Sequence, residues 1–111
     1  MKLVFNSINK DIFLMLQDGR KKIETRAATI KYKKLKIGDD IIFSCGGESF
    51  DRKIKKITYL DSIKSLLEIY NPEDINPAIK EKDELVAMYH SFPGYEEKIK
   101  NNGIVALEFM S

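Results

Sequence analysis

The sequence predicts an α+β domain built on a small, mostly antiparallel β-barrel. Apolar runs typical of strands lie near the start, in the middle and near the end of the chain, at residues 3–5, 41–45 and 103–109. Segments with helical periodicity are inserted between these runs. Strands separated in this way by helices are typical of an α+β architecture. The length of 111 residues, without repeats or linker-like tracts, suits a single domain over residues 1–111.

The composition predicts a soluble globular protein. Hydrophobic residues make up 43% of the chain and charged residues 32%, which is enough apolar material for one core. No apolar run reaches the length of about 18 residues that a membrane-spanning helix needs, and the N-terminus lacks the pattern of a secretory signal. Because Cys45 is the single cysteine, no internal disulfide is expected. We therefore expect a cytoplasmic location. With a single histidine, His90, the chain offers no set of zinc ligands, and we expect no metal and no cofactor.

The first elements are expected to be a strand and a helix. Residues 3–5 read as a short buried strand, and a helix is expected to begin near Asn9, with Asn9 or Ser7 as its N-cap. The helix carries apolar residues at helical spacing on one face: Ile12, Phe13 and Leu16. Gly19 is expected to end it, because glycine tolerates the left-handed conformation found after many helices.

A polar strand is expected directly after this helix, at residues 22–26. Polar and less polar residues alternate there, as they do in a half-buried strand. The alternation places three charged side chains on one face: Lys22, Glu24 and Arg26. Ile23 and Thr25 are expected on the opposite face.

The middle of the chain predicts a hairpin. Residues 31–36 are expected to form an exposed turn, followed by a strong strand at residues 41–45. The glycines at positions 46 and 47 signal a tight turn, and residues 50–59 form the returning strand. Lys55 and Lys56 break the alternation of this strand, which indicates a β-bulge.

The last third predicts two helices, a loop and a strand. Helices are expected at residues 63–70 and 77–89, and a turn-rich aromatic loop at residues 90–95. Residues 103–109 are almost entirely apolar, which is typical of a strand in the centre of a sheet.

Charge is distributed unevenly along the chain. Residues 20–36 hold eight lysines and arginines against Glu24 alone, whereas residues 68–84 hold six acidic residues against two lysines. Such asymmetry indicates one face suited to an anion and another that is simply solvated. Lysine-rich segments that only maintain solubility are the alternative.

Two short motifs stand in a characteristic order. The first is G-x-K-x-x-E-x-R, formed by Gly19, Lys21, Glu24 and Arg26. About a dozen residues later comes G-D-x-I-x-F, formed by Gly38, Asp39, Ile41 and Phe43. With these motifs and the closing strand at residues 103–107, the chain resembles the ASCH domain, a branch of the PUA-like superfamily, over nearly its whole length. Residues 88–93 are similar to the segment before the closing strand in small stand-alone archaeal and bacterial members.

This resemblance implies a fold and a ligand. The fold is a small PUA-like β-barrel of about five to six mostly antiparallel strands with flanking helices. The ligand is RNA or a nucleotide or nucleoside, bound in a cleft beside the strand that carries G-x-K-x-x-E-x-R. A few family members resemble enzymes, namely an amidohydrolase that acts on acetylated cytidine and at least one proposed ribonuclease.

Three charged side chains of the first motif are the principal candidates for ligand binding. Arg26 is able to donate two parallel hydrogen bonds to a phosphate or a base carbonyl. Glu24 is able to accept from an exocyclic amine, as carboxylates do with cytosine. Lys21 offers a charge for a phosphate, or an amine that burial makes reactive. The alternative is an exposed Glu24–Arg26 ion pair beside a solvated Lys21, worth only about 0–1 kcal/mol.

Five further residues complete the predicted binding site: Lys22, Ser44, Tyr89, Phe92 and Tyr95. Lys22 belongs to the basic rim, and Ser44 lies near the end of the G-D-x-I-x-F strand. Tyr89 is expected in the core with its hydroxyl at the cleft. Phe92 and Tyr95 are expected in the aromatic loop, either as a lid that stacks on a base or as anchors of that loop.

Catalysis is left open by the sequence. In the amidohydrolase branch a threonine occupies the position of Glu24, so that mechanism does not transfer directly. If the chain is an enzyme, Lys21 and Glu24 are the expected catalytic residues, with Glu24 as a general base for hydrolysis. A third alternative is a non-catalytic domain that binds another protein through the acidic residues 68–84. The sequence does not predict an oligomeric state.

Overall fold

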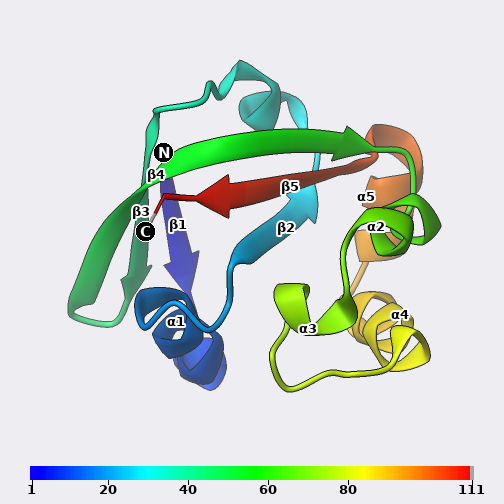
Figure 1. Ribbon diagram of the computed structural model, residues 1–111, viewed down its shortest axis with the longest axis horizontal. Helices are drawn as coiled ribbons and strands as arrows, with labels where there is room; N and C mark the ends of the chain where they lie inside the picture. The colour runs from blue at the N-terminus through cyan, green and yellow to red at the C-terminus, as the bar shows by residue number, and fades with distance from the viewer. Residues whose placement is uncertain (111) are drawn as a thin grey trace.

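The computed structural model describes residues 1–110, and its centre is one five-stranded mixed sheet that curls into a half-barrel (Figure 1). The strand order is β1-β3-β4-β5-β2. The strands are β1 (Lys2–Phe5), β2 (Ile23–Ala27), β3 (Asp40–Cys45), β4 (Glu48–Leu60) and β5 (Ile104–Phe109). Only the pairing of β1 with β3 is parallel, and the other three pairings are antiparallel. The predicted α+β fold with a mostly antiparallel barrel is therefore confirmed, in a half-open form.

Helices cover the two faces of the sheet unequally. The helix α1 (Lys10–Gln17), preceded by the short 3-10 turn η1 (Ser7–Asn9), lies at one end of the half-barrel. A second 3-10 segment, η2 (Ile30–Lys34), follows β2. Four helices gather on the other side of the sheet (Figure 1). These are α2 (Ile63–Ile69), α3 (Pro72–Ile75), α4 (Lys82–Ser91) and α5 (Tyr95–Asn102).

The central strand β5 separates two hydrophobic cores. Val105 and Leu107 face the first core, which is inside the half-barrel and includes Phe13 of α1. Ile104 and Ala106 face the second core, between the sheet and the helices α2 to α5. Because both faces of β5 are buried over residues 104–107, that stretch is entirely apolar, and Glu108 follows where the strand becomes partly exposed. The predicted central position is confirmed, since β5 lies between β4 and β2.

A β-bulge in β4 explains its irregular sequence. The register with β5 shifts between Ile54 and Lys56, where Lys55 is the extra residue. The shift lets Ile54 and Ile57 both face the first core, although they are three positions apart. The bulge predicted at Lys55 and Lys56 is confirmed.

The helical region differs from the prediction. The helix expected at residues 77–89 begins only at Lys82 and continues to Ser91, and the short α3 precedes it. The loop expected at residues 90–95 is correspondingly shorter, and Tyr95 is the first residue of α5 rather than a loop residue. The sequence pattern does not predict α5, because Ile99 is the only residue of that helix that is buried, so no apolar stripe marks it. Within residues 1–110, no helix has the length and apolarity needed to span a membrane.

Gly103 is the glycine whose replacement we expect to cost most. Its φ is +78°, and a Cβ there would lie 2.5 Å from the Leu60 carbonyl oxygen. We predict that Gly103→Ala lowers the free energy of unfolding by about 2–6 kcal/mol, the sum of about 1–3 kcal/mol for a backbone conformation that is essentially restricted to glycine and about 1–3 kcal/mol for overpacking. Urea denaturation measures this loss. Gly47→Ala is the matched control, since its Cβ would meet open space, and an equal loss in both variants would contradict the explanation.

Candidate functional site

A cleft of about 340 Å³ opens where the half-barrel fails to close. Its walls include Val4 and Phe5 of β1 and residues 24–26 of β2, the two strands at opposite ends of the sheet order. Residues from η1, α1, α3, α4 and α5 cover the remaining sides. The volume lies at the lower end of the range for small-molecule sites, about 300–1,000 Å³. The cleft is therefore large enough for one small organic ligand, and we call it the seam cleft.

The free edge of β2 borders this cleft. The backbone N–H of Ala28 donates to Gly103 on the β5 side, so the backbone groups of residues 23, 25 and 27 point outward. Three side chains satisfy outward groups in place of a neighbouring strand: Lys21, Glu24 and Tyr95. Covering an edge in this way avoids buried backbone groups without partners.

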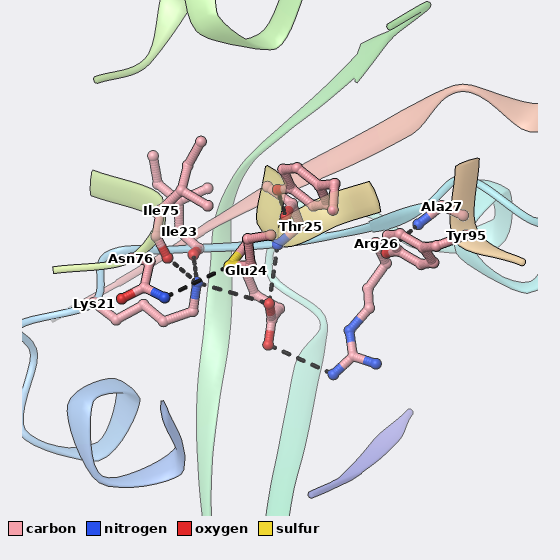
Figure 2. A network of polar contacts seen from close by, with 11 residues as sticks. Lys21, Ile23, Glu24, Thr25, Arg26, Ala27, Ile75, Asn76 and Tyr95 are labelled. Carbon is pink, nitrogen blue, oxygen red and sulfur yellow. Dashed lines mark hydrogen bonds and ion pairs between the residues drawn. The ribbon is translucent and has the colours of Figure 1, made fainter. Parts of the chain in front are cut away.

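Lys21 is buried and holds β2 against α3. Its Nζ donates to the carbonyl oxygen of Ile23 at 2.6 Å and to that of Ile75, and lies 3.8 Å from Glu24 Oε1 (Figure 2). Desolvation lowers the pKa of the Lys21 ammonium, and the carboxylate of Glu24 opposes this effect. Two of the three protons of this ammonium are donated to the backbone carbonyls, and Glu24 Oε1 is an ion-pair partner beyond hydrogen-bond distance. Lys21 is thus committed to the protein rather than to a ligand.

Glu24 is also buried, but only one of its two oxygens has a hydrogen-bond donor. Oε1 accepts from the backbone N–H of Thr25 at 3.1 Å, whereas Oε2 has no hydrogen-bond partner within residues 1–110. The nearest cation to Oε2 is the Arg26 guanidinium, with Nη2 at 3.6 Å, too far for a hydrogen bond. Glu24 is only 6% exposed. A buried carboxylate oxygen without a donor is costly. Glu24 is among the residues that line the seam cleft, and its Oε2 lies on the side of the Arg26 guanidinium (Figure 2).

Arg26 reaches from β2 across the opening toward β1. Its guanidinium carbon lies 5.5 Å from the centre of the Phe5 ring, a cation–π contact. Burial lowers the pKa of Arg26, but the nearby Glu24 carboxylate, together with Tyr32 and Tyr95, outweighs this effect, so the pKa is raised overall. The side chain is 30% exposed. Arg26 therefore remains charged and keeps N–H donors available to the cleft.

Three aromatic residues form one corner of the cleft. The Tyr89 hydroxyl is hydrogen-bonded to Thr25 Oγ1, and the Tyr95 ring stacks on Tyr89 at 6.0 Å between centroids. The Tyr95 hydroxyl accepts from the backbone N–H of Ala27 at 2.8 Å. Burial raises the pKa of Tyr89 and raises that of Tyr95 to about 12, so both phenols are neutral at pH 7. Phe92 packs edge-on against both tyrosines and is 43% exposed.

Six of the predicted ligand-binding residues line the seam cleft: Lys21, Glu24, Arg26, Tyr89, Phe92 and Tyr95. Glu24 and Arg26 share a strand face, as the alternation predicts. Tyr89 is in the core as expected, but its hydroxyl is buried against Thr25. Tyr95 is anchored to β2, which corresponds to the anchoring alternative rather than the lid.

Two predicted residues lie elsewhere. Lys22 is exposed and does not line the seam cleft, because it precedes β2 and the strand alternation does not extend to it. Ser44 is buried in β3 and is also absent from the lining. The reason is that β1 pairs along the outer edge of β3 and forms the wall of the opening in its place.

The seam cleft has a smaller net positive charge than the basic residues 20–36 predict. Its charged lining residues are Lys21, Glu24 and Arg26, and the lysines of residues 31–36 do not reach it. Sequence reasoning also missed polar lining residues that carry no motif, namely Asn6, Asn9 and Asn76. Within residues 1–110, no group of three or more histidine, cysteine or acidic side chains is arranged to hold a metal ion.

Two solved structures are similar to this chain over nearly its whole length. The crystal structure of hypothetical protein PH0355 is 31% identical, with a TM-score of 0.78, over 98% of this chain and 97% of that one. The solution structure of protein PF0455 from Pyrococcus furiosus is 28% identical, with a TM-score of 0.73, over 98% of this chain and 96% of that one. No family model and no curated protein matches the sequence.

We predict that Lys21→Met destabilises the protein by about 3–5 kcal/mol, the usual cost of removing one partner of a buried ion pair and leaving the other charge uncompensated. The carbonyl oxygens of Ile23 and Ile75 lose their donor, and the Glu24 carboxylate loses its buried cation. Adding Glu24→Gln to this variant should recover part of the loss, because an amide carries no charge to bury. Chemical denaturation of the two single variants and the double variant measures the coupling, and additive losses would argue against it.

The pKa of Tyr95 predicts a loss of stability in alkali. Burial raises this pKa from 10.0 to about 12 in the folded protein. The contribution of Tyr95 to the free energy of unfolding is therefore complete below pH 10 and is lost as the pH rises toward 12. The free energy of unfolding should therefore fall less steeply over this range in Tyr95→Phe than in the original protein. The difference comes mainly from Tyr95, with a smaller part from its effect on the pKa of Tyr89, because the other phenols with raised pKa are present in both proteins. Parallel pH profiles would contradict the assignment.

Proposed function

We propose that this chain, which belongs to the same family as PH0355, is an ASCH-type protein that binds RNA or a nucleotide by holding one unpaired base in the seam cleft. The observation that carries the proposal is the buried Oε2 of Glu24, which has no hydrogen-bond donor within residues 1–110. A ligand N–H placed against it would satisfy the oxygen and offset its desolvation. The ligand that fits must therefore present a donor at this position.

The pairing of Glu24 with Arg26 favours a nucleobase. Glu24 only accepts hydrogen bonds and Arg26 only donates them, and their nearest atoms are 3.6 Å apart. The edges of bases carry N–H donors beside carbonyl or ring-nitrogen acceptors, which is the complementary arrangement. A buried carboxylate would repel a bare phosphate at the same place. We therefore assign the base, rather than a phosphate, to Glu24 and Arg26.

The aromatic corner favours the same ligand. Phe92 lines the cleft and is the most exposed of the aromatic side chains that do so. Stacking of a base on an aromatic ring contributes about 1–3 kcal/mol. Because the cleft has room for about one base and its sugar, an unpaired nucleotide fits better than a duplex.

The residues of the first motif support the ASCH assignment by their positions. Gly19, at φ +86°, ends α1 and starts the connection that brings Lys21 beneath β2. Lys21, Glu24 and Arg26 then form one chain of charges along the cleft. The free thiol of Cys45 is buried, which fits a protein of the reducing cytoplasm.

Hydrolysis of a modified base is the second candidate function. The free Oε2 of Glu24 is suited to accept a proton from water or substrate, with Arg26 beside it to stabilise developing negative charge. Lys21 is not suited to act as a nucleophile, because its protons point at protein oxygens. Mass spectrometry of acylated nucleosides incubated with the protein distinguishes a hydrolase from a binder.

We predict that Glu24→Gln weakens binding of the preferred nucleoside by about 10- to 100-fold, the effect of replacing a charged acceptor in a buried contact. Isothermal titration calorimetry with a panel of ribonucleosides and their 5′-monophosphates measures the change. Glu48→Gln is the matched control, because Glu48 is an exposed carboxylate at the start of β4. A Glu24→Gln variant that binds as tightly as the original protein would overturn the proposed contact.

A further inference from the structure

A second hollow adjoins the seam cleft and shares Lys21 as part of its wall. Its volume is about 290 Å³, and its lining comes from the end of α1, the connection to β2, Phe43 of β3, the part of β4 around the bulge and the end of β5. Lys21 turns inward beneath β2, whereas the next residue, Lys22, is exposed at this hollow. We call it the outer hollow.

The outer hollow is more cationic than the seam cleft. Its lining contains Lys21, Lys22, Arg52 and Lys55, against one carboxylate, Glu108. Lys22, Arg52 and Lys55 make no ion pair with any residue from 1 to 110. A concentration of unpaired cations around a hollow attracts a phosphate group.

Glu108 and Arg52 are both held in place by neighbouring groups. Glu108 Oε2 accepts a hydrogen bond from the Tyr70 hydroxyl at 2.7 Å, so this oxygen of the carboxylate already has a donor within the protein. The Arg52 guanidinium donates to the carbonyl oxygens of Gln17 and Asp51, each at 2.9 Å, and lies over the Phe50 ring. These contacts leave other N–H groups of the guanidinium for a ligand, in an orientation already fixed.

The bulge in β4 supplies Lys55. As the extra residue of the bulge, Lys55 leaves the strand alternation and lines the hollow beside Phe109. The floor is apolar, with Leu16 and Phe109 among its residues. An apolar floor with a cationic rim fits the base and sugar of a nucleotide together with its phosphate.

We propose that the outer hollow binds the neighbouring nucleotide of a single strand whose unpaired base occupies the seam cleft. The proposal rests on the proposed function and names its substrate class, a single-stranded oligonucleotide rather than a free nucleoside. Lys22, Arg52 and Lys55 hold the phosphate, and the strand passes across the connection between α1 and β2.

The test compares ligands of different length and a variant of the exposed lysines. Fluorescence anisotropy competition at several salt concentrations measures binding of ribonucleosides, 5′-monophosphates and homopolymeric trinucleotides. We expect a trinucleotide to bind at least tenfold more tightly than its nucleoside. The double variant Lys22→Gln/Lys55→Gln should lose this advantage, and its salt slope should fall by about 0.7, the value for one phosphate contact on a single strand. Its affinity for the nucleoside should not change.

The controls separate this inference from the proposed function. Lys33→Gln/Lys34→Gln removes two exposed lysines of η2 that line neither hollow, and should leave the trinucleotide advantage intact. Equal affinity for nucleoside and trinucleotide, or an equal loss in both double variants, overturns the outer hollow but not the base site. A 5′-monophosphate that gains the whole lysine-dependent advantage also overturns it, since the hollow then receives a terminal phosphate. Failure of every ligand to bind overturns the proposed function itself.

Discussion

An edge strand has backbone N–H and C=O groups that no neighbouring strand satisfies, and β2 presents such groups to the opening of the half-barrel. The candidate site depends on how they are covered. Lys21 supplies a donor for the Ile23 carbonyl, and Glu24 and Tyr95 supply acceptors for the N–H groups of Thr25 and Ala27. These are also residues that line the seam cleft. The same side chains therefore carry a structural role and the ligand-binding role that we propose.

Glu24 divides these two roles between its oxygens. Oε1 belongs to the protein, through Thr25 and Lys21, whereas Oε2 has no hydrogen-bond donor among residues 1–110. Lys21 makes the division stable, because its charge lies on the Oε1 side and balances a carboxylate that is otherwise too costly to bury. Arg26 does not close onto Oε2, since its guanidinium extends toward Phe5 on the opposite strand. The result is a preformed acceptor beside a preformed donor.

The sequence predicts the parts of this site that depend on local spacing. Glu24 and Arg26 share a face because strand side chains alternate, and the bulge at Lys55 follows from a break in the same alternation. The sequence does not predict the contact of Lys21 with Ile75, because this contact joins residues far apart in the chain and uses a backbone carbonyl, which has no sequence signature. The sequence wrongly predicts Ser44 in the cleft, because the pairing of β1 with β3 joins segments far apart in the chain and has no local sequence signal. The sequence also does not predict the short helix α5, because this helix buries little apolar surface.

The most direct measurement of the central claim is a crystal structure of the protein soaked with ribonucleosides. The account predicts a base in the seam cleft, with a ligand N–H donor within about 3 Å of Glu24 Oε2, the Arg26 guanidinium on a neighbouring acceptor and Phe92 against the ring. It is contradicted if the cleft stays empty while the Arg26 guanidinium closes onto both oxygens of Glu24, or if the nucleoside binds at a place that Glu24 does not touch.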